Sequence, residues 1–369
     1  MPRFLNKFFI LFITTVAIAF GISFLSTAQA RTKFFYTVTE LNNLGYIGQG
    51  HVNFAYDIND SGQVVGFSYA SNGEMRSVVW ENGIITADWR LIGSRNYASA
   101  INNAGQVAAN STPNSHTLGK CPSLWEKGNF VANIGECGGT SYVNGINNAG
   151  QVVGWSLDEP FVWKDGVTTP LSLPGRNTGG SQATDINDGG QAVGHFHVQN
   201  PGILQPDGNT ISVESTSHAA LWQPKGKIKD LGILPGGKYS DALSINRFGQ
   251  VAGWADTSDK TKHAVLWQRG VIKDLGLLQN NATQATSINN LGTVVGYSTV
   301  ISEYSKEVPV HGFVWKNGNM RDLNKLLPAN SGWAINTATS INNRGQIVGQ
   351  GTFNGENKPY LLTPTWLIN

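Results

Sequence analysis

Three acidic side chains near repeated Ile-Asn pairs are the natural candidates for acid–base chemistry in this sequence. Asp57 and Asp185 each stand directly before such a pair, and Asp241 lies a little upstream of another. Two carboxylates at a suitable separation can hydrolyse a glycosidic bond, one acting as acid and the other as base or nucleophile. However, Asp57 and Asp185 fall in the first and fourth of seven repeats, described below, that we expect to surround a central channel. We therefore expect the two carboxylates on different sides of that channel. No Ser-His-Asp motif with a nucleophile elbow, phosphate-binding glycine loop or zinc signature occurs, which makes an enzyme the less favoured class.

Two stretches partly match the start of a calcium loop, "DINDSG" at 57–62 and "DINDGG" at 185–190. Calcium takes about six to eight oxygen ligands, and such loops end on a bidentate Glu at the twelfth position. Ser68 and Phe196 occupy that position here, and the other repeats lack the leading Asp. We therefore interpret both stretches as Asn/Asp-Gly turns and expect no metal or other cofactor, with calcium as the alternative.

Aromatic and histidine side chains divide into those that repeat and those that do not. Six tryptophans and three histidines recur at fixed positions of a repeated unit. We interpret the tryptophans as packing between repeats and the histidines as stabilising single repeats: Trp80, Trp125, Trp163, Trp222, Trp267, Trp315, His218, His263 and His311. A ligand site has to break the repeat symmetry. The candidate ligand-binding residues are therefore the ones at links between repeats and at the start of the longest loop: Tyr97, Tyr142, Tyr239, Trp333, His195 and His197.

These candidates lie on a chain that repeats itself. The marker "I-N-x-x-G" occurs seven times, beginning at Ile58, Ile101, Ile146, Ile186, Ile245, Ile288 and Ile341. Each marker is followed by a strand-like segment such as "QVVGFS" and, in six copies, by a segment ending in tryptophan such as "HAVLW", which degenerates to "KPYLL" in the seventh. A fourth segment, clearest in "VIKDLGLL", closes the repeat. Asn-x-x-Gly supplies residues that tolerate turn conformations, and the segments between turns are rich in strand formers. Four short strands per repeat predict the blade of a β-propeller.

The two ends of the repeat array are complementary. The N-terminal "FFYTVTELNNLG" resembles the fourth segment of a repeat, and the last repeat stops after its third segment, "KPYLLTP". We therefore predict an all-β, seven-bladed propeller of four-stranded antiparallel blades, closed by the N-terminal strand joining the last blade. The Ile-Asn strand is then innermost, and the variable loops lie on the face opposite the Asn-x-x-Gly turns. Binding residues are often found on variable loops held by a rigid scaffold. We also expect a strand glycine, such as Gly66, to allow close approach to a neighbouring blade.

Residues 1–30 read as a signal peptide. Arg3 and Lys7 precede an apolar run from Phe8 to about Leu25, and "AQA" ends at Ala30. The alternative is an uncleaved membrane anchor. Removing two basic residues from 26 Lys+Arg leaves 24 against 24 Asp+Glu, and a neutral domain lacks the footprint of a nucleic-acid binder. We expect one propeller domain over residues 31–369, exported to the periplasm or outside the cell, with no membrane span after cleavage.

The chain has two cysteines, Cys121 and Cys137. Export places them where a disulfide can persist, and no His/Cys cluster with metal-ligand spacing lies nearby. We therefore predict a Cys121–Cys137 disulfide, with two free thiols or half of a metal site as the alternatives.

The segments "HAALW", "HAVLW" and "HGFVW", together with "INNAGQVVGW" and "KDLGILPGG", resemble the HAF-type extracellular repeat family of bacterial exported proteins. The resemblance covers about residues 33–365, but Arg76, Cys121 and Glu159 stand where the histidine would be. It implies an extracellular or periplasmic repeat protein and no enzyme activity. The hypothesis is a binding module for a glycan or an envelope protein, with its site on the variable-loop face. The alternatives are a propeller lyase or glycosidase and a structural envelope protein; the ligand and the oligomeric state stay open.

Overall fold

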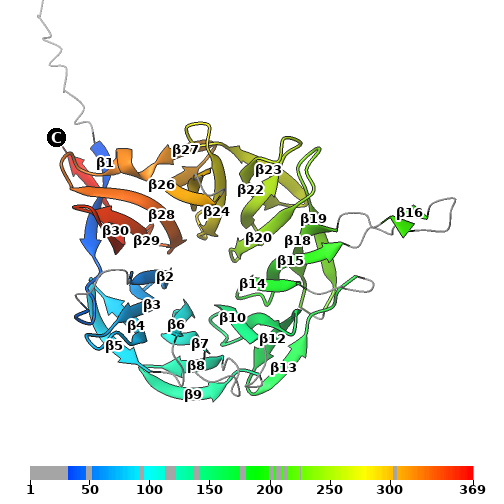
Figure 1. Ribbon diagram of the computed structural model, residues 1–369, viewed down its shortest axis with the longest axis horizontal. Coiled ribbons are helices and arrows are strands. Elements are labelled where there is room, and N and C mark those ends of the chain that lie inside the picture. Colours follow the sequence, from blue (N-terminus) through cyan, green and yellow to red (C-terminus); the bar gives the residue numbers. More distant parts are fainter. Residues whose placement is uncertain are drawn as a thin grey trace, which may run out of the picture. The chain divides into compact units, whose positions relative to one another are not determined.

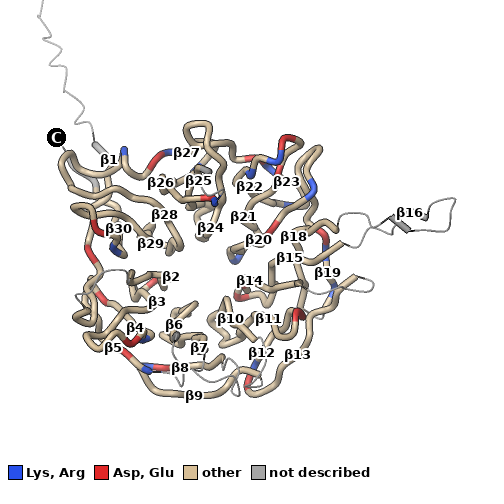
Figure 2. The backbone as a smooth tube through the Cα atoms, in the orientation of Figure 1, with Lys and Arg blue, Asp and Glu red and all other residues tan. Residues whose placement is uncertain are grey.

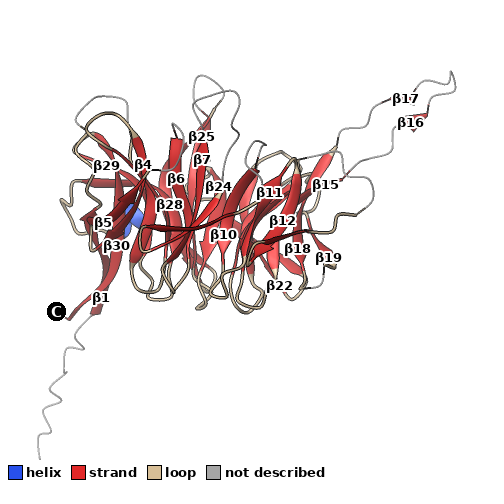
Figure 3. Cartoon of the chain, turned by 90° about the horizontal axis from the view of Figure 1, so that it is seen from below, coloured by secondary structure: helices blue, strands red, loops and turns tan. Residues whose placement is uncertain are grey.

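In the computed structural model each of the seven repeats folds as a four-stranded antiparallel sheet, and the seven sheets stand around a central channel (Figure 1). The sequence-based prediction of an all-β, seven-bladed propeller is therefore confirmed. Backbone is described for residues 32–46, 52–90, 95–112, 122–135, 141–174, 180–198, 203–204, 210–211, 215–224, 226–301 and 306–368. Figure 3 shows the strands running from one face of the ring to the other.

The strands of each blade follow one another from the channel outward. Blades one to three consist of β2 (Phe54–Ile58), β3 (Gln63–Tyr69), β4 (Met75–Glu81), β5 (Ile84–Trp89); β6 (Arg95–Ile101), β7 (Gln106–Thr112), β8 (Ser123–Glu126), β9 (Asn129–Asn133); and β10 (Ser141–Ile146), β11 (Val152–Ser156), β12 (Glu159–Lys164), β13 (Val167–Pro170). Blade four consists of β14 (Gln182–Ile186), β15 (Ala192–Val198), β18 (Thr216–Trp222) and β19 (Ile228–Gly232), with the small β16 (Ile203–Leu204) and β17 (Thr210–Ile211) pair inserted.

Blades five and six consist of β20 (Ser240–Ile245), β21 (Val251–Asp256), β22 (Lys262–Gln268), β23 (Val271–Gly276) and of β24 (Ala282–Ile288), β25 (Val294–Ile301), β26 (Glu307–Lys316), β27 (Asn319–Asp322). A short 3-10 helix, η1 (Leu323–Leu326), leads to blade seven. That blade consists of β28 (Trp333–Ile341), β29 (Ile347–Phe353), β30 (Glu356–Ile368) and, as its outermost strand, β1 (Thr32–Glu40). The N-terminal strand therefore completes the last blade, as the complementary chain ends predict.

The asparagine of each Ile-Asn pair holds its own turn and the next blade at once. In blade one, Asn59 Oδ1 accepts hydrogen bonds from the backbone N–H groups of Ser61 and Gln63, both at 3.0 Å. Its Nδ2 donates across the blade boundary to Asn102 O at 3.1 Å. The same pattern runs around the ring and returns to its start, since Asn342 Nδ2 donates to Asn59 O at 3.0 Å. These buried amides form a closed belt that links the blades.

Each strand glycine touches a different neighbour from the one we expected. A Cβ built on Gly66 would lie 1.9 Å from Phe54 O, and one on Gly154 would lie 1.9 Å from Tyr142 O. Both carbonyls belong to the inner strand of the same blade, so the prediction of close approach to a neighbouring blade is wrong. The reason is a bulge in the inner strand at this level, which pushes its backbone against the second strand.

The repeated tryptophans pack the blades, as expected. Trp80 and Trp222 are 0% exposed and donate their indole N–H to Asn42 O and Ser172 O, both at 2.8 Å. One compact unit, Phe34–Trp366, contains the blades except for the first two residues of β1 and the last two of β30. The predicted signal peptide lies outside the described residues, and so do both cysteines of the predicted disulfide. No helix in the described part of the chain has the length and apolar character needed to span a bilayer.

Candidate ligand-binding site

The channel holds two small cavities. The one on the Asn-x-x-Gly side has a volume of ≈ 190 Å³ and is walled by the Ile-Asn pairs of every blade. The other, at mid-channel, has a volume of ≈ 140 Å³. Asp57 of blade one and Asp185 of blade four line both, whereas Asp241 lines neither. Charged residues otherwise gather mainly around the outer rim of the ring (Figure 2).

Both channel carboxylates link blades. Asp57 accepts from Ile101 N of the next blade at 3.0 Å and from Ser340 Oγ of the last blade at 2.7 Å. Asp185 accepts from Ile245 N of the next blade at 2.9 Å. Burial raises the pKa of both carboxyls, that of Asp185 to about 7, where the charge of Asp57 adds to the burial and the hydrogen bonds oppose it. Their oxygens thus point at neighbouring blades rather than into the turns, where a calcium loop would need them.

The residue at the bulge of the inner strand is polar in most blades and aromatic in blade one. At the bulge of most blades stands a polar residue whose side chain donates to a carbonyl of the next blade: Asn144 to Ala183 O, Thr184 to Ala242 O, Thr286 to Ala338 O and Thr339 to Ala55 O. Blade one has Tyr56 there. Its ring packs on Tyr97 of blade two, with centroids 5.5 Å apart, and it lines the mid-channel cavity. A polar link between blades is replaced by an aromatic contact.

Tyr56 and Tyr97 belong to a larger group. Phe54 lies 4.7 Å from Tyr56, and Phe67 lies 6.0 Å from it, ring centroid to ring centroid. All four rings are partly exposed. Phe54 begins the inner strand, Phe67 lies near the end of the second, and Tyr97 lies near the start of the next inner strand. These strand ends are on the face opposite the Asn-x-x-Gly turns, which is the variable-loop face.

Blade three carries a second pair of aromatic rings next to this group in the order of the blades. The rings of Tyr142 and Trp155 stack with centroids 4.7 Å apart and planes at 30°. Asn110, which pairs with Tyr97 across the strands of blade two, exchanges hydrogen bonds of 2.8 and 2.9 Å with the backbone of Val143, next to Tyr142. We call Phe54, Tyr56, Phe67, Tyr97, Tyr142 and Trp155 the aromatic site.

Sequence reasoning found only two members of the aromatic site. It missed those that follow the strand glycine, although a signal was present: an aromatic or histidine ring stands directly after this glycine in five of seven repeats, as Phe67, Trp155, His195, Trp254 and Tyr297. Burial raises the pKa of Tyr56 to about 12 and that of Tyr97 further, so both phenols stay neutral and can donate hydrogen bonds at ordinary pH. The aromatic site can therefore offer both stacking faces and hydroxyl groups to a ligand.

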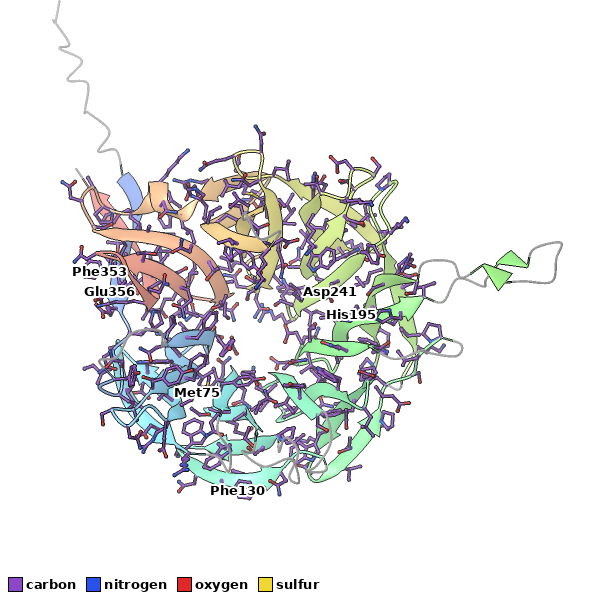
Figure 4. The ribbon with its side chains drawn as sticks, viewed as in Figure 1. Met75, Phe130, His195, Asp241, Phe353 and Glu356 are labelled. Carbon is purple, nitrogen blue, oxygen red and sulfur yellow. The ribbon has the colours of Figure 1, made fainter. Side chains whose placement is uncertain are left out.

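Two residues that the sequence placed in different categories meet at the boundary of blades four and five. His195 Nδ1 lies 3.0 Å from Asp241 Oδ1, and His195 Nε2 lies 2.9 Å from Gly180 O (Figure 4). A carbonyl can only accept, so Nε2 carries a proton. Burial alone would lower the pKa of His195, but Asp241 and the Gly180 carbonyl outweigh it and raise the pKa. The two residues therefore form a partly buried ion pair between blades four and five.

This arrangement predicts a specific pH dependence of stability. Because the pKa of His195 is raised on folding, the pair stabilises fully below the unfolded pKa and its contribution is lost as pH rises through the folded pKa. We expect His195→Gln to destabilise the protein by about 1–2 kcal/mol near pH 6 and by less near pH 9, as measured by urea unfolding. His197→Gln is the matched control: burial and the charge of His195 lower the pKa of His197, so its pH dependence should have the opposite sign. Equal losses at both pH values for His195→Gln would refute the assignment.

The remaining candidates lie away from the aromatic site. Trp333 stacks on Phe353, with centroids 5.1 Å apart, at the start of the long inner strand of blade seven. Tyr239 precedes β20, and its hydroxyl donates to Ser215 O at 3.4 Å.

The three recurring histidines stabilise single blades, as the sequence analysis expected. His218, His263 and His311 each lie next to an aspartate of the outer strand of their own blade, Asp230, Asp274 and Asp322, at 2.8, 2.8 and 3.1 Å. Blade one has a matching pair in Arg76 and Asp88, 2.9 Å apart. No group of three His, Cys, Asp or Glu suited to a metal ion occurs among the described residues.

Comparison with known proteins defines the class as a β-propeller. A family described as a protein of unknown function, DUF3466, matches residues 276–361, which lie in blades five to seven. The β-propeller domain of the Trilobed protease from Pyrococcus furiosus is 10% identical over 85% of this chain and 94% of its own, with a TM-score of 0.52. That domain is described as having an open velcro topology, whereas here β1 pairs with β30. At this identity the likeness shows the fold alone.

Two further solved propellers match with lower TM-scores. A gluconolactonase from Xanthomonas campestris is 10% identical over 86% of this chain and 99% of its own, with a TM-score of 0.41. The WD40 propeller domain of Doa1 is 12% identical over 88% and 96%, with a TM-score of 0.42. No curated protein matches the sequence.

Proposed function

We propose that this protein is an exported binding module that recognises a glycan at the aromatic site. The observation that carries the proposal is the contact between the tilted rings of Tyr56 and Tyr97, because Tyr56 occupies a position where most other blades carry a polar link. If packing between blades alone decided this position, we would expect the polar residue that most other blades have. A partly exposed ring in its place therefore indicates a role other than packing the blades.

Sugar rings are bound by aromatic faces together with polar groups that hydrogen-bond their hydroxyls. The aromatic site offers partly exposed rings from three consecutive blades. The mid-channel cavity next to it is lined by Ser99, Asn144 and Thr184 as well as by Tyr56, so hydroxyl and amide groups lie beside the ring faces. Export is supported by the apolar N-terminal segment and by the resemblance to HAF-type repeats.

An enzyme that cleaves polysaccharide would use Asp57 and Asp185, the two carboxylates that share the channel. Asp185, with its pKa at about 7, has the property of a general acid. However, both carboxylates already accept hydrogen bonds from the backbone of the next blade. Linking blades accounts for their positions, so binding without turnover is the function we favour.

A glycan-array screen of the purified protein, with and without calcium, tests the proposal. We expect selective binding that Tyr97→Ala weakens by about tenfold, the loss of one well-stacked ring. Tyr56→Thr should weaken it similarly while restoring the polar link found in other blades. Phe130→Ala is the control, since Phe130 is an exposed ring on the outer strand β9. If no glycan bound, or if binding survived both tyrosine variants, this site would be excluded. An envelope protein would then be the favoured ligand.

A further inference from the structure

On the face that carries the Asn-x-x-Gly turns, one position breaks the repeat and leaves a gap between blades six and seven. Six of the seven markers are followed by glutamine: Gln63, Gln106, Gln151, Gln191, Gln250 and Gln346. Blade six has Thr293 instead. The threonine side chain ends at its γ atoms, so it lacks the carboxamide that glutamine places at the boundary between two blades.

The structure shows what that glutamine does elsewhere. In blade one, Gln63 Oε1 accepts from Asn59 Nδ2 at 2.7 Å, and the same bond recurs in the other five blades that carry glutamine. Each glutamine also covers the turn glycine of the next blade: its amide oxygen lies 3.2–3.6 Å from where a Cβ on that glycine would be. At Gly345 of blade seven, where Thr293 is the counterpart, only Pro364 Cγ comes within 4 Å, at 3.6 Å.

A cavity of ≈ 520 Å³ occupies this gap, larger than either channel cavity. Its lining includes Asn289 and Thr293 of blade six and Gly345 of blade seven, the three residues that a glutamine would otherwise bring together. The volume falls within the range of about 300–1,000 Å³ that small-molecule sites occupy. The missing side chain therefore coincides with a pocket of ligand size.

The lining combines apolar surface with positive charge. Phe34 and Tyr36 of β1, whose rings meet edge to face with centroids 5.1 Å apart, join Val314 and Pro364 on the apolar side. The charged lining residues are Lys316, Arg321 and Arg344, all exposed, and the described lining contains no acidic residue. None of the three cations forms an ion pair with a residue in the described part of the chain.

We propose that this cavity, the seam pocket, binds a small organic acid with an apolar body and one carboxylate. The apolar body lies against Phe34, Tyr36 and Val314, and the carboxylate lies toward the cations, where a guanidinium can donate two parallel hydrogen bonds. The pocket lies where β1 closes the ring, so the ligand bridges blade six, blade seven and the N-terminal strand. This site is separate from the aromatic site, and neither proposal depends on the other.

The test compares three probes of one shape by calorimetry on the purified protein: 2-naphthoate, its neutral amide, and 2-naphthylmethylammonium. We expect 2-naphthoate to bind at one site, about tenfold more tightly than the amide, with no binding of the cation. Bound 2-naphthoate should also raise the melting temperature, because it binds the folded ring across its seam.

Two variants locate the site. Thr293→Gln places the side chain of the other six repeats in the gap, so it should weaken 2-naphthoate binding by at least about tenfold while keeping the melting temperature of the free protein. Thr168→Gln, the same change at an exposed position of β13, should leave binding intact. Arg321→Ala with Arg344→Ala should erase the preference for naphthoate over the amide, and Arg247→Ala, an exposed turn arginine of blade five, should not.

The outcomes are decisive in both directions. Loss of binding in Thr293→Gln together with loss of charge preference in the arginine double variant establishes the seam pocket. Equal affinity for acid and amide, no saturable binding of any probe in the millimolar range, or binding unchanged by Thr293→Gln overturns it. Should Thr293→Gln fail to fold, the arginine double variant alone decides, because its readout is a ratio of affinities and not stability.

Discussion

Asn342→Ala is expected to be among the most damaging single substitutions in this protein, lowering the free energy of unfolding by about 3–5 kcal/mol. Asn342 is 4% exposed. Its Oδ1 accepts from Arg344 N at 3.1 Å and from Gln346 N at 2.9 Å, and its Nδ2 donates to Gln346 Oε1 at 2.8 Å. A second Nδ2 bond, to Asn59 O at 3.0 Å, crosses from blade seven to blade one.

The loss is large because alanine leaves several buried polar groups without partners. An unpaired buried donor or acceptor costs more than a typical hydrogen bond contributes, since it has been removed from water without compensation. The Asn59 carbonyl and the two turn N–H groups would be in that position. Asn342 also stands where the ring closes, next to the hydrogen bond between Thr339 Oγ1 and Ala55 O at 2.9 Å.

Equilibrium unfolding in guanidinium, followed by tryptophan fluorescence, measures this effect. Asn129→Ala is the matched control: Asn129 is exposed on β9, and we expect that change to stay within about 0.5 kcal/mol of wild type. If Asn342→Ala cost no more than Asn129→Ala, the amide belt would not be the element that holds the blades together.

Asp185→Ser is expected to act in the opposite direction, and only at neutral to alkaline pH. Burial, with a contribution from the charge of Asp57, raises the pKa of Asp185 from 3.8 to about 7. A carboxyl whose pKa is raised on folding contributes stability that is fully present below its unfolded pKa and is lost as pH rises through the folded pKa. Wild type should therefore lose up to about 4 kcal/mol from this group between pH 4 and pH 8.

Serine is the informative replacement because blades five to seven already carry it at this position, as Ser244, Ser287 and Ser340. Ser244 Oγ accepts from Ile288 N of the next blade at 3.4 Å, so a serine at 185 can keep the bond from Ile245 N and remove the charge. We expect the variant to be more stable than wild type by about 2 kcal/mol at pH 8 and slightly less stable at pH 4.

Urea unfolding across this pH range tests the prediction. Glu159→Ser removes one carboxylate from an exposed position of β12 and should leave the pH profile parallel to that of wild type. A stability difference between Asp185→Ser and wild type that stayed constant from pH 4 to pH 8 would falsify the raised pKa of Asp185.

The repeated residues determined the architecture from sequence alone. Seven Ile-Asn markers set the number of blades, and the resemblance of the N-terminal segment to a fourth strand predicted that β1 joins β30. These features can be predicted because the same local pattern recurs along the chain: the Asn-x-x-Gly turn in all seven repeats, and the strand glycine and the tryptophan in six. A pattern repeated this often is a stronger signal than any single position.

Contacts between blades could not be read in the same way. The bulge that brings Gly66 against Phe54 O lies within one blade, and the sequence did not distinguish this from an approach between blades. His195 and Asp241 were candidates for different roles because they lie 46 residues apart along the chain, and only the packing of blade four on blade five makes them a pair.

The candidate sites depend on this distinction most of all. Sequence reasoning sought residues that break the repeat at the links between blades, and it named Tyr97 and Tyr142, which the structure places within the inner strands β6 and β10. It missed Tyr56, at the bulge of β2, and Thr293, in the turn before β25. Their importance depends on what lies across the blade boundary: the ring of Tyr97 in one case, an uncovered Gly345 in the other. The sequence alone determined the number, strand order and closure of the blades, because local turn and strand preferences recur along the chain. Only the tertiary structure decided where stacking faces and a ligand-sized cavity arise, because both are properties of two blades in contact.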